Sequence, residues 1–284
     1  MKHILVTGAN GQLGSELQFL SKNHNDFNFT FVDVDDLDIT DQNKVIQYFA
    51  QGKFDVCINC AAYTAVDKAE SDQELAFKVN VCGPENLAIA CDKNNTTLFH
   101  VSTDFVFEGD SSTAYSENMQ TSPLGVYGHT KLKGEQVIQQ VLKKYYILRT
   151  AWLYSSYGNN FVKTMLRLGR ERGELGVIVD QIGTPTYARD LAKAILLLIN
   201  DNQECYGVYH FSNEGVASWY DFAKTIFMMK NIEVNVNPIP TSAYPTPAKR
   251  PSFSLLDKSK IKTTFNITIP YWQESLLNCL KLID

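Results

Sequence analysis

The sequence predicts an α/β protein built on a doubly wound parallel sheet, followed by a smaller C-terminal region. Three observations predict this fold. Short, nearly all-apolar runs alternate with helical patterns through the first half of the chain, a glycine-rich turn follows the first run, and the alternation weakens after Thr150. Strands that are apolar on both faces and separated by helices are typical of a parallel sheet covered on each side. The pattern therefore favours the doubly wound class.

The expected elements of the first half follow one another in alternation. Apolar runs of strand length cover residues 3–7, 29–33, 54–59, 97–102 and 145–150. Helical patterns lie between them, at residues 12–20, 41–49, 72–94 and 127–144. Because a helix separates each strand from the next, neighbouring strands are expected to run parallel.

The second half is less regular. A helix is expected at residues 159–173, a strand at 176–180 and a second helix at 188–200. Five prolines crowd residues 235–251, so much of that tail is expected to be loop. We therefore expect residues 1–150, with 186–214 returning to them, to form the sheet domain, and residues 151–185 and 215–284 to form the smaller region.

Composition narrows the class of protein. The 284 residues carry a net charge of -5, which argues against general nucleic-acid binding. The longest late apolar run, Ala194–Ile199, is far shorter than the ~20 residues that span a bilayer, and the apolar run at the N-terminus is too short for a signal peptide. We expect a cytoplasmic protein with no membrane partner. The six cysteines indicate no disulfide framework, and the five histidines form no metal motif.

A glycine turn joins the first strand to the first helix. The stretch "TGANGQLG" places Gly8, Gly11 and Gly14 between them. The first two glycines let the backbone turn tightly and approach a diphosphate, and the third lets the helix pack closely on the strand. The helix N-terminus then faces the negative charge. This context predicts a Rossmann-like dinucleotide site more strongly than the glycine pattern alone would.

Asp33 is the candidate residue for the adenosine ribose. It ends the second strand, where a carboxylate can accept hydrogen bonds from the ribose hydroxyls. Its neighbours are Val34, Asp35 and Asp36, with no cation to hold a 2′-phosphate. The charge pattern therefore favours NADH over NADPH. The alternative that Asp33 only caps a loop stays open.

Candidate site residues lie at the end of the fourth strand and the start of the helix that follows. Ser102, Thr103 and Asp104 end the strand, at the edge where such sheets bind ligands. Tyr127 and Lys131 are one helical turn apart, so they share a face and can point toward that strand end.

This set suits reduction of a carbonyl. Hydride addition leaves negative charge on the oxygen, which needs a proton from an acid such as Tyr127. A free tyrosine has a pKa near ~10. A nearby ammonium favours the phenolate, so we expect Lys131 to lower the pKa of Tyr127. Thr103 can donate a hydrogen bond to the same oxygen. The alternative is that Tyr127 and Lys131 form an exposed pair without a catalytic role.

These residues together resemble the extended short-chain dehydrogenase/reductase family, and within it a branch of nucleotide-sugar reductases. Matching stretches run along nearly the whole chain: "TGANGQLG", "LDITD", "INCAAYTAVDKAE", "VNVCGPENLA", "STDFVFEG", "YGHTKLKGE", "LRTAWLY", "NNFVKTM", "DQIGTPT" and "RPSFSLLDKSKI". The glycine turn and the Tyr-Lys pair identify only the superfamily. The stretches "AAYTAVDKAE", "RTAWLY" and "RPSFSLLD" are more particular to the reductase branch.

The resemblance implies an enzyme that uses NADH or NADPH to reduce the C4 keto group of dTDP-4-dehydro-6-deoxy-L-mannose to dTDP-L-rhamnose, with Tyr127 as proton donor. The sheet domain would be an NAD(P)-binding Rossmann domain and the smaller region would bind the dTDP-sugar. By position, the cofactor contacts would be Gln12, Leu13, Asp38, Ile39, Ala61, Ala62, Tyr63 and Lys131. The sugar would meet Thr103, Asp104, Tyr127 and Trp152.

Trp152 and Arg250 also have physical interpretations of their own. The flat indole of Trp152 can stack on a sugar face or fill core, and the resemblance favours the sugar. Arg250 can pair with the substrate diphosphate, and a structural ion pair is an equal alternative.

One departure concerns metal and assembly. Some family members place carboxylates at a magnesium-linked dimer contact. Glu16 fits one such position, but a later position holds Arg189. We therefore expect no metal, while a homodimer formed in another way stays open.

Two other functions stay open at this point. The regulatory beta subunit of methionine adenosyltransferase is similar in fold and motifs, and it binds a cofactor without catalysing a reduction. The intact set of Thr103, Tyr127 and Lys131 favours a working reductase over such a subunit. Another nucleotide-sugar reductase or an epimerase of the same superfamily is the third hypothesis, and an epimerase needs further acid and base groups for which the sequence offers no convincing candidates.

Overall fold

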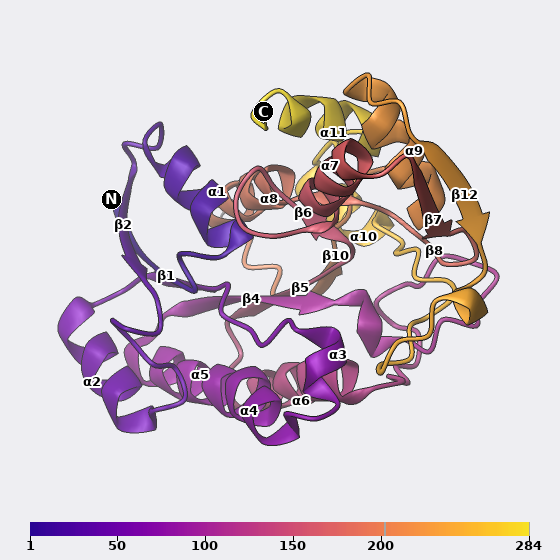
Figure 1. Ribbon diagram of the computed structural model, residues 1–284. Helices are drawn as coiled ribbons and strands as arrows, with labels where there is room; N and C mark the ends of the chain where they lie inside the picture. Colours follow the sequence, from indigo (N-terminus) through magenta and orange to yellow (C-terminus); the bar gives the residue numbers. More distant parts are fainter. Residues whose placement is uncertain (202, 284) are drawn as a thin grey trace.

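A six-stranded parallel sheet forms the centre of the protein (Figure 1). The computed structural model describes residues 1–201 and 203–283. The strands are β1 (Lys2–Thr7), β2 (Phe27–Val32), β3 (Val56–Asn59), β4 (Thr97–Thr103), β5 (Tyr145–Thr150) and β10 (Gly207–His210). Their order across the sheet is β10-β5-β4-β3-β1-β2, and every neighbouring pair is parallel. The predicted doubly wound fold is confirmed.

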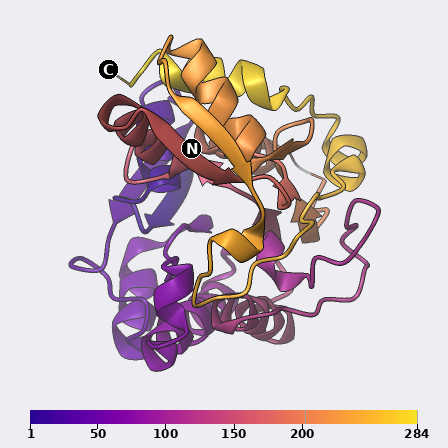
Figure 2. The same cartoon turned by 45° about the vertical axis from the view of Figure 1, so that its right-hand side comes forward.

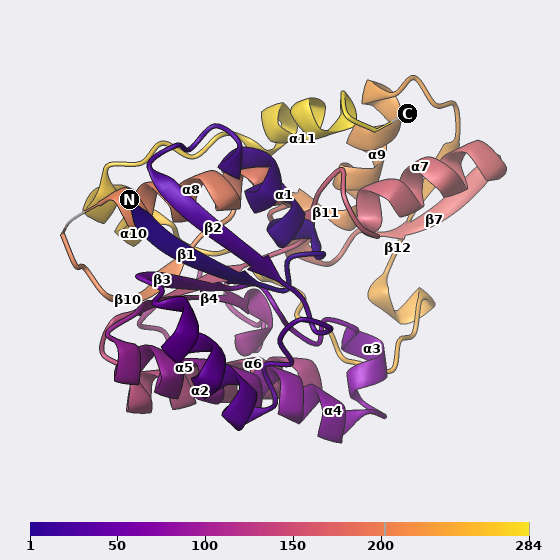
Figure 3. The ribbon, with the colours of Figure 1, turned by 90° about the vertical axis from the view of Figure 1, so that its left-hand side faces the viewer.

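Helices cover both faces of the sheet (Figure 3). One face carries α1 (Gln12–Ser21) and α8 (Ala188–Asn200), and the other carries α2 (Gln42–Gly52), α5 (Gly83–Asn94) and α6 (Val126–Val141). Alternate residues of β1 pack against the helices on the two faces of the sheet, because successive side chains of a strand point to opposite faces. Ile4 and Val6 lie in the core under α1 and α8, whereas Leu5 lies in the core over α2 and α5.

The helical run before β4 contains an irregular turn. The sequence predicts one helix at residues 72–94; the structure has α4 (Gln73–Phe77), a π-helical turn (Lys78–Cys82) and α5 in continuous succession. The turn buries Asn80, whose side chain accepts a hydrogen bond from the Tyr63 backbone N–H at 2.8 Å and donates one to the Tyr63 carbonyl at 3.1 Å. Its amide also donates to Thr130 Oγ1 on α6 at 3.1 Å. The turn therefore fixes the loop after β3 against α6.

A second core lies in the C-terminal half (Figure 2). Its main elements are α7 (Phe161–Glu171), β7 (Glu174–Ile178), α9 (Trp219–Met229), β12 (Asn235–Ile239) and α11 (Trp272–Leu280). Short pieces complete the chain: α3 (Val66–Ala69), β6 (Leu153–Tyr154), β8 (Ile182–Gly183), β9 (Thr186–Tyr187), β11 (Ala217–Ser218), α10 (Ser259–Phe265) and two 3-10 turns (Asp104–Val106 and Thr241–Ala243). Phe222, Ile226 and Leu276 are fully buried in this second core.

Much of the proline-rich stretch at residues 235–251 is loop, as expected, apart from the short 3-10 turn at Thr241–Ala243. Its first five residues form β12, which pairs in parallel with β7. Pro238 lies opposite Val177 in this ladder. Proline is tolerated here because a two-stranded ladder leaves one side of each strand unpaired, so the missing backbone donor costs little.

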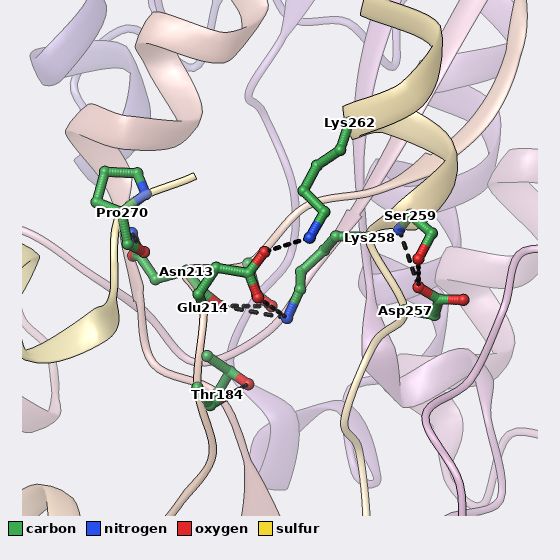
Figure 4. Close-up of polar contacts among 10 residues, drawn as sticks. Thr184, Asn213, Glu214, Asp257, Lys258, Ser259, Lys262 and Pro270 are labelled. Carbon is green, nitrogen blue, oxygen red and sulfur yellow. Dashed lines mark hydrogen bonds and ion pairs between the residues drawn. The ribbon is translucent and has the colours of Figure 1, made fainter. Parts of the chain in front are cut away.

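Polar contacts fasten the C-terminal segment to the end of β10 (Figure 4). Glu214 accepts a hydrogen bond from Lys262 at 2.8 Å and forms an ion pair with Lys258 at 3.5 Å. The Lys258 ammonium also donates to the Asn213 carbonyl at 3.4 Å. Helix α8 and strand β10 belong to the layers of the central sheet. The contacts of Glu214 hold the chain after Asp257 beside the end of β10. No helix among the described residues is long and apolar enough to cross a membrane.

Candidate active site

The glycine turn packs closely against the neighbouring backbone. Gly8 has φ +66°, and a Cβ added there would lie 2.6 Å from the Ala61 backbone nitrogen. A Cβ on Gly14 would lie 2.5 Å from the Gly8 carbonyl oxygen. Larger residues are therefore excluded at both positions. Helix α1 starts at the N-cap residue Gly11 without a side-chain cap, so its first N–H groups can serve an anion.

Asp33 lies beside this turn, at the end of β2. One of its carboxylate oxygens accepts a hydrogen bond from the Asn10 backbone N–H at 2.8 Å, and the other accepts one from the Val34 N–H at 2.8 Å. The exposed residues Asp35 and Asp36 follow it. The backbone thus holds the carboxylate in place beside the glycine turn, within a locally negative surface.

Further predicted cofactor residues surround the same edge of the sheet. Asp38 accepts hydrogen bonds from the Thr40 backbone and hydroxyl at 2.9 and 2.8 Å. Ile39 is buried and packs against Gly83 at the start of α5. The remaining members follow β3 or begin α1, and they are partly buried except for Leu13, which lies in the core: Gln12, Leu13, Ala61, Ala62 and Tyr63.

The structure brings Tyr127 to the end of β4, as the helical spacing predicts. Its ring contacts Phe105 edge to face, with centroids 5.5 Å apart. Burial raises the pKa of Tyr127 to about 12, while a hydrogen bond with the Thr103 side chain acts in the opposite direction. The expectation that Lys131 lowers this pKa is wrong for this structure, because burial of the phenol outweighs every other influence and the lysine is bonded elsewhere.

Lys131 is buried against β4. Its ammonium nitrogen donates to the Val101 carbonyl at 2.7 Å and lies 3.3 Å from Nε2 of His100. Burial lowers the pKa of Lys131 to about 8, although the Glu135 carboxylate favours the charged form. Burial thus favours the uncharged amine of Lys131 more than at an exposed lysine, which the sequence pattern does not reveal.

Asp104 is a buried carboxylate with one free oxygen. Oδ1 accepts a hydrogen bond from the Thr103 hydroxyl at 3.0 Å, and Oδ2 has no hydrogen-bond partner among the described residues. Burial raises the pKa of Asp104 to about 6, and the side chains of Ser254 and Thr103 partly offset the effect. An unpartnered buried oxygen next to Thr103 is suited to accept a hydrogen bond from a hydroxyl group of a ligand.

Ser102 uses its hydroxyl within the protein. Its hydroxyl donates a short hydrogen bond to Glu135, and Arg149 binds the same carboxylate through Nε at 3.0 Å and Nη2 at 2.7 Å. Glu135 is fully buried and Arg149 nearly so. This ion pair ties α6 to β4 and β5, and it therefore sets the position of the helix that carries Tyr127.

Trp152 lies just past β5 in a backbone conformation that is rare outside glycine, with φ +48°. Its indole stacks on Trp219, with ring centroids 3.6 Å apart and planes 12° from parallel. Gly183 leaves room for it, because a Cβ there would lie 2.9 Å from the indole. One face of Trp152 is therefore covered by Trp219.

A cavity of about 900 Å³ adjoins these rings. Phe161, Trp219 and Gln181 contribute to its wall, and Gln181 accepts a hydrogen bond from the Trp219 indole at 3.1 Å. Three arginines also line it: Arg167, Arg172 and Arg250. Arg250 pairs with Asp67. Sequence reasoning missed Trp219 and Gln181, since they come from distant segments without a shared motif.

Glu16, which was considered as a metal ligand, is occupied by protein groups. Its carboxylate accepts hydrogen bonds from Arg189 Nε and the Ser155 hydroxyl, each at 2.6 Å. Arg189 is the residue that departs from the family pattern, and its guanidinium provides the positive charge next to this buried carboxylate.

A doubly wound sheet, an uncapped helix behind a glycine turn, and a Tyr-Lys pair beside a strand-end threonine together define a protein of the short-chain dehydrogenase/reductase class. Within this class, the chain belongs to the family described as RmlD substrate binding domain, whose family model matches residues 1–284. The resemblance seen in the sequence is confirmed.

Named relatives support the same assignment. A dTDP-4-dehydrorhamnose reductase of Aggregatibacter actinomycetemcomitans is 43% identical over 290 residues, covering 98% of each chain, and one of Escherichia coli K12 is 40% identical over 283 residues, covering 95% of this chain and 94% of that one. The crystal structure of a dTDP-4-dehydrorhamnose reductase from Clostridium acetobutylicum matches with TM-score 0.94 and 46% identity, and one from Bacillus anthracis in complex with NADP with TM-score 0.95 and 41% identity; each match covers 99% of both chains.

Proposed function

We propose that this protein is an NAD(P)H-dependent reductase that converts dTDP-4-dehydro-6-deoxy-L-mannose to dTDP-L-rhamnose. The names of its relatives support the class of reaction, since three of them are dTDP-4-dehydrorhamnose reductases. The observation that carries the proposal is the phenol of Tyr127 beside the Thr103 hydroxyl at the carboxyl end of β4.

The glycine turn and α1 fit the diphosphate of a nicotinamide dinucleotide, because Gly8 and Gly14 leave no room for side chains and the first N–H groups of α1 lack a side-chain cap. Gln12 and Leu13 would contact the diphosphate, Asp33 the adenosine ribose, and Ala61 the middle of the cofactor. Asp38, Ile39, Ala62, Tyr63 and Ser102 complete the proposed cofactor set. A bound reduced nicotinamide would supply the hydride. The negative surface at Asp33 favours NADH, and a lower KM for NADPH than for NADH would contradict this preference.

Tyr127 would give its proton to the C4 oxygen. A phenol whose pKa is raised to about 12 is protonated at neutral pH, which is the form that a proton donor needs. The Thr103 hydroxyl, which donates to Asp104 Oδ1 in the structure, would turn its one hydrogen to the same oxygen and stabilise the charge that develops there. Lys131 would bind the nicotinamide ribose. The free oxygen of Asp104 would accept a hydrogen bond from a sugar hydroxyl.

The 900 Å³ cavity would hold the nucleoside diphosphate of the substrate. Its aromatic wall at Phe161 and Trp219 suits a flat base, and arginine suits a diphosphate. Of the three arginines, Arg250 would bind the diphosphate. Trp152 would pack against the sugar. In this arrangement residues 1–150 with 186–214 bind the cofactor, and residues 151–185 with 215–284 bind the substrate.

The test is NADH oxidation with dTDP-4-dehydrorhamnose, compared with GDP- and UDP-linked keto sugars. We expect turnover with the dTDP sugar, loss of nearly all of it in Tyr127→Phe, and near-normal NADH binding by that variant. Tyr271→Phe is the matched control, because Tyr271 is exposed at the start of α11. Near-normal turnover by Tyr127→Phe would refute the assigned proton donor. Cofactor binding without turnover of any sugar by the wild type would favour a regulatory subunit.

A further inference from the structure

A row of polar side chains crosses the sheet directly beneath Lys131. Thr7, Asn59 and His100 are register partners on the adjacent strands β1, β3 and β4. The Thr7 hydroxyl donates to Asn59 Oδ1 at 2.8 Å, and Asn59 Nδ2 lies 3.0 Å from His100 Nδ1. The other imidazole nitrogen, Nε2, lies 3.3 Å from the Lys131 ammonium nitrogen. All four side chains are at most 2% exposed.

Thr7 and Asn59 end their strands, and His100 lies between the apolar residues Phe99 and Val101 of β4. Buried polar groups must satisfy one another completely, and apolar residues of similar volume would often stabilise the fold at least as well. The row therefore calls for an explanation other than stability. It ends on a lysine that the proposed reaction uses.

The hydrogen bonds of the row determine which imidazole nitrogen carries the proton. The Ala61 backbone N–H donates to Asn59 Oδ1 at 3.1 Å, and a backbone N–H can only donate. The oxygen of the Asn59 amide must therefore face Ala61 and Thr7, which turns the NH₂ group toward His100. Nδ1 of His100 must then accept. Burial, reinforced by the nearby Lys131, holds the pKa of His100 well below its usual range, so the ring is neutral and its proton lies on Nε2.

That proton points at Lys131. An N–H donor facing Nζ favours the amine, which has a lone pair, over the ammonium, which has none. The other groups that act on Lys131 are Val101, whose carbonyl accepts from it, Glu135 one turn further along α6, and Cys60 after β3. Glu135 and Cys60 both act in favour of the charged form, and burial acts against it.

We propose that His100 is a positioning residue for Lys131, and that Asn59, oriented by the Ala61 backbone N–H, fixes the imidazole so that its Nε2–H is directed at the lysine nitrogen and favours the uncharged amine. This inference rests on the proposed function for its purpose. In that function Lys131 binds the nicotinamide ribose, and an amine, which has a lone pair, can accept a hydrogen bond from a ribose hydroxyl where an ammonium cannot.

The tautomer can be measured directly in the wild-type protein without cofactor or substrate. Long-range ¹H–¹⁵N NMR of the histidine ring distinguishes a protonated Nε2 from a protonated Nδ1. We expect the proton on Nε2. A proton on Nδ1 of His100 would overturn the proposal, whatever the variants do and whether or not the substrate has been assigned correctly.

A second experiment uses an isosteric substitution to reverse the direction of the hydrogen bond between residue 59 and His100. In Asn59→Asp the carboxylate can still accept from Ala61 and Thr7, but it now accepts from Nδ1–H as well, so Nε2 presents a lone pair to Lys131. We expect the titration midpoint of the Lys131 side chain, followed by NMR, to rise by roughly one pH unit or more. Thr7→Val is the control, because it shortens the row without reversing it, and its midpoint should stay near that of the wild type.

The new carboxylate also attracts the ammonium through space, so a double-mutant cycle with His100→Leu separates the two effects. The shift caused by Asn59→Asp should be clearly smaller in the His100→Leu background, where no imidazole transmits the change. Equal shifts in both backgrounds would show that the imidazole transmits nothing, and would overturn the proposal. The pH profile of kcat for Asn59→Asp should move in the same direction as the NMR midpoint.

Discussion

Arg250 and Asp67 form a two-pronged ion pair at the edge of the large cavity. Nη1 of Arg250 donates to Oδ1 of Asp67 at 3.0 Å and Nη2 donates to Oδ2 at 2.7 Å. Asp67 also accepts a hydrogen bond from the Ala248 backbone at 3.2 Å. The pair joins α3, after the third strand of the sheet, to the C-terminal segment. This is the structural ion pair that the sequence left open for Arg250, and a diphosphate would have to draw the guanidinium away from Asp67 in order to bind it.

Removal of this arginine tests that assignment. Arg250→Ala should raise KM for the dTDP-sugar about tenfold or more and leave KM for NADH nearly unchanged, because a bidentate arginine contact contributes affinity for a phosphate group. The measurement is steady-state kinetics with each substrate varied in turn. Lys249→Ala is the control, since it removes the same charge from the exposed neighbouring position. An equal rise of KM in both variants would indicate a general loss of positive charge.

Replacement of Thr103 by Val should lower kcat by about a hundredfold. Its hydroxyl is the proposed hydrogen-bond donor to the C4 oxygen, and loss of one such donor typically has an effect of this size. Thr103→Ser keeps the hydroxyl and should retain much of the activity. The hypothesis fails if the Val and Ser variants turn over the sugar at similar rates.

The buried carboxylate of Asp104 makes folding stability depend on pH. Its folded pKa of about 6 lies above its ordinary value, so the folded state binds the proton more tightly than the unfolded chain does. The stabilising contribution is complete below the unfolded value of ~3.9 and is lost as pH rises to about 6, amounting to about 3 kcal/mol.

Urea unfolding at pH 4.5 and pH 7 measures this dependence. Asp104→Asn cannot titrate, so its free energy of unfolding should lose less than that of the wild type between the two values. Glu108→Gln changes an exposed carboxylate in the same loop and should follow the wild type. Identical changes in all three proteins would contradict the raised pKa.

The ion pair between Glu135 and Arg149 should matter far more to stability than a surface pair. Arg149→Met leaves the Glu135 carboxylate buried without its partner, and we expect the free energy of unfolding to fall by roughly 3–5 kcal/mol. Arg167 and Glu171 on α7 form an exposed pair at 2.8 Å. Arg167→Met is the control, and it should change stability by no more than about 1 kcal/mol. Urea unfolding of both variants decides the comparison.

The local chemistry of the sequence predicts a good part of the fold and of the site. Gly14 is required by contacts with Gly8 and Ala9 a few residues away, and Tyr127 and Lys131 share a helix face by spacing alone. Both features can therefore be found without coordinates. The same is true of the alternating strands, because each carries its own apolar pattern.

Features that depend on long-range packing could not be predicted. The pKa of Tyr127 depends on how deeply the phenol is buried and on where the Lys131 nitrogen finds its partners. Trp219 and Gln181 meet only after the two halves of the C-terminal region have folded together. Strand β12 exists because β7 lies beside it, and the residues around Pro238 do not predict that pairing.

The π-helical turn at Lys78–Cys82 limits how the gene for this protein can change. A π-turn holds one residue more than an α-turn, because its hydrogen bonds span five residues instead of four. Deleting one residue there would let the run close as an ordinary α-helix and leave Leu87 and Cys91 in the core that they fill, but Asn80 would lose its place against the backbone of Tyr63. A single-codon deletion in this stretch should thus spare the core and damage the loop after β3, so the extra residue serves the site.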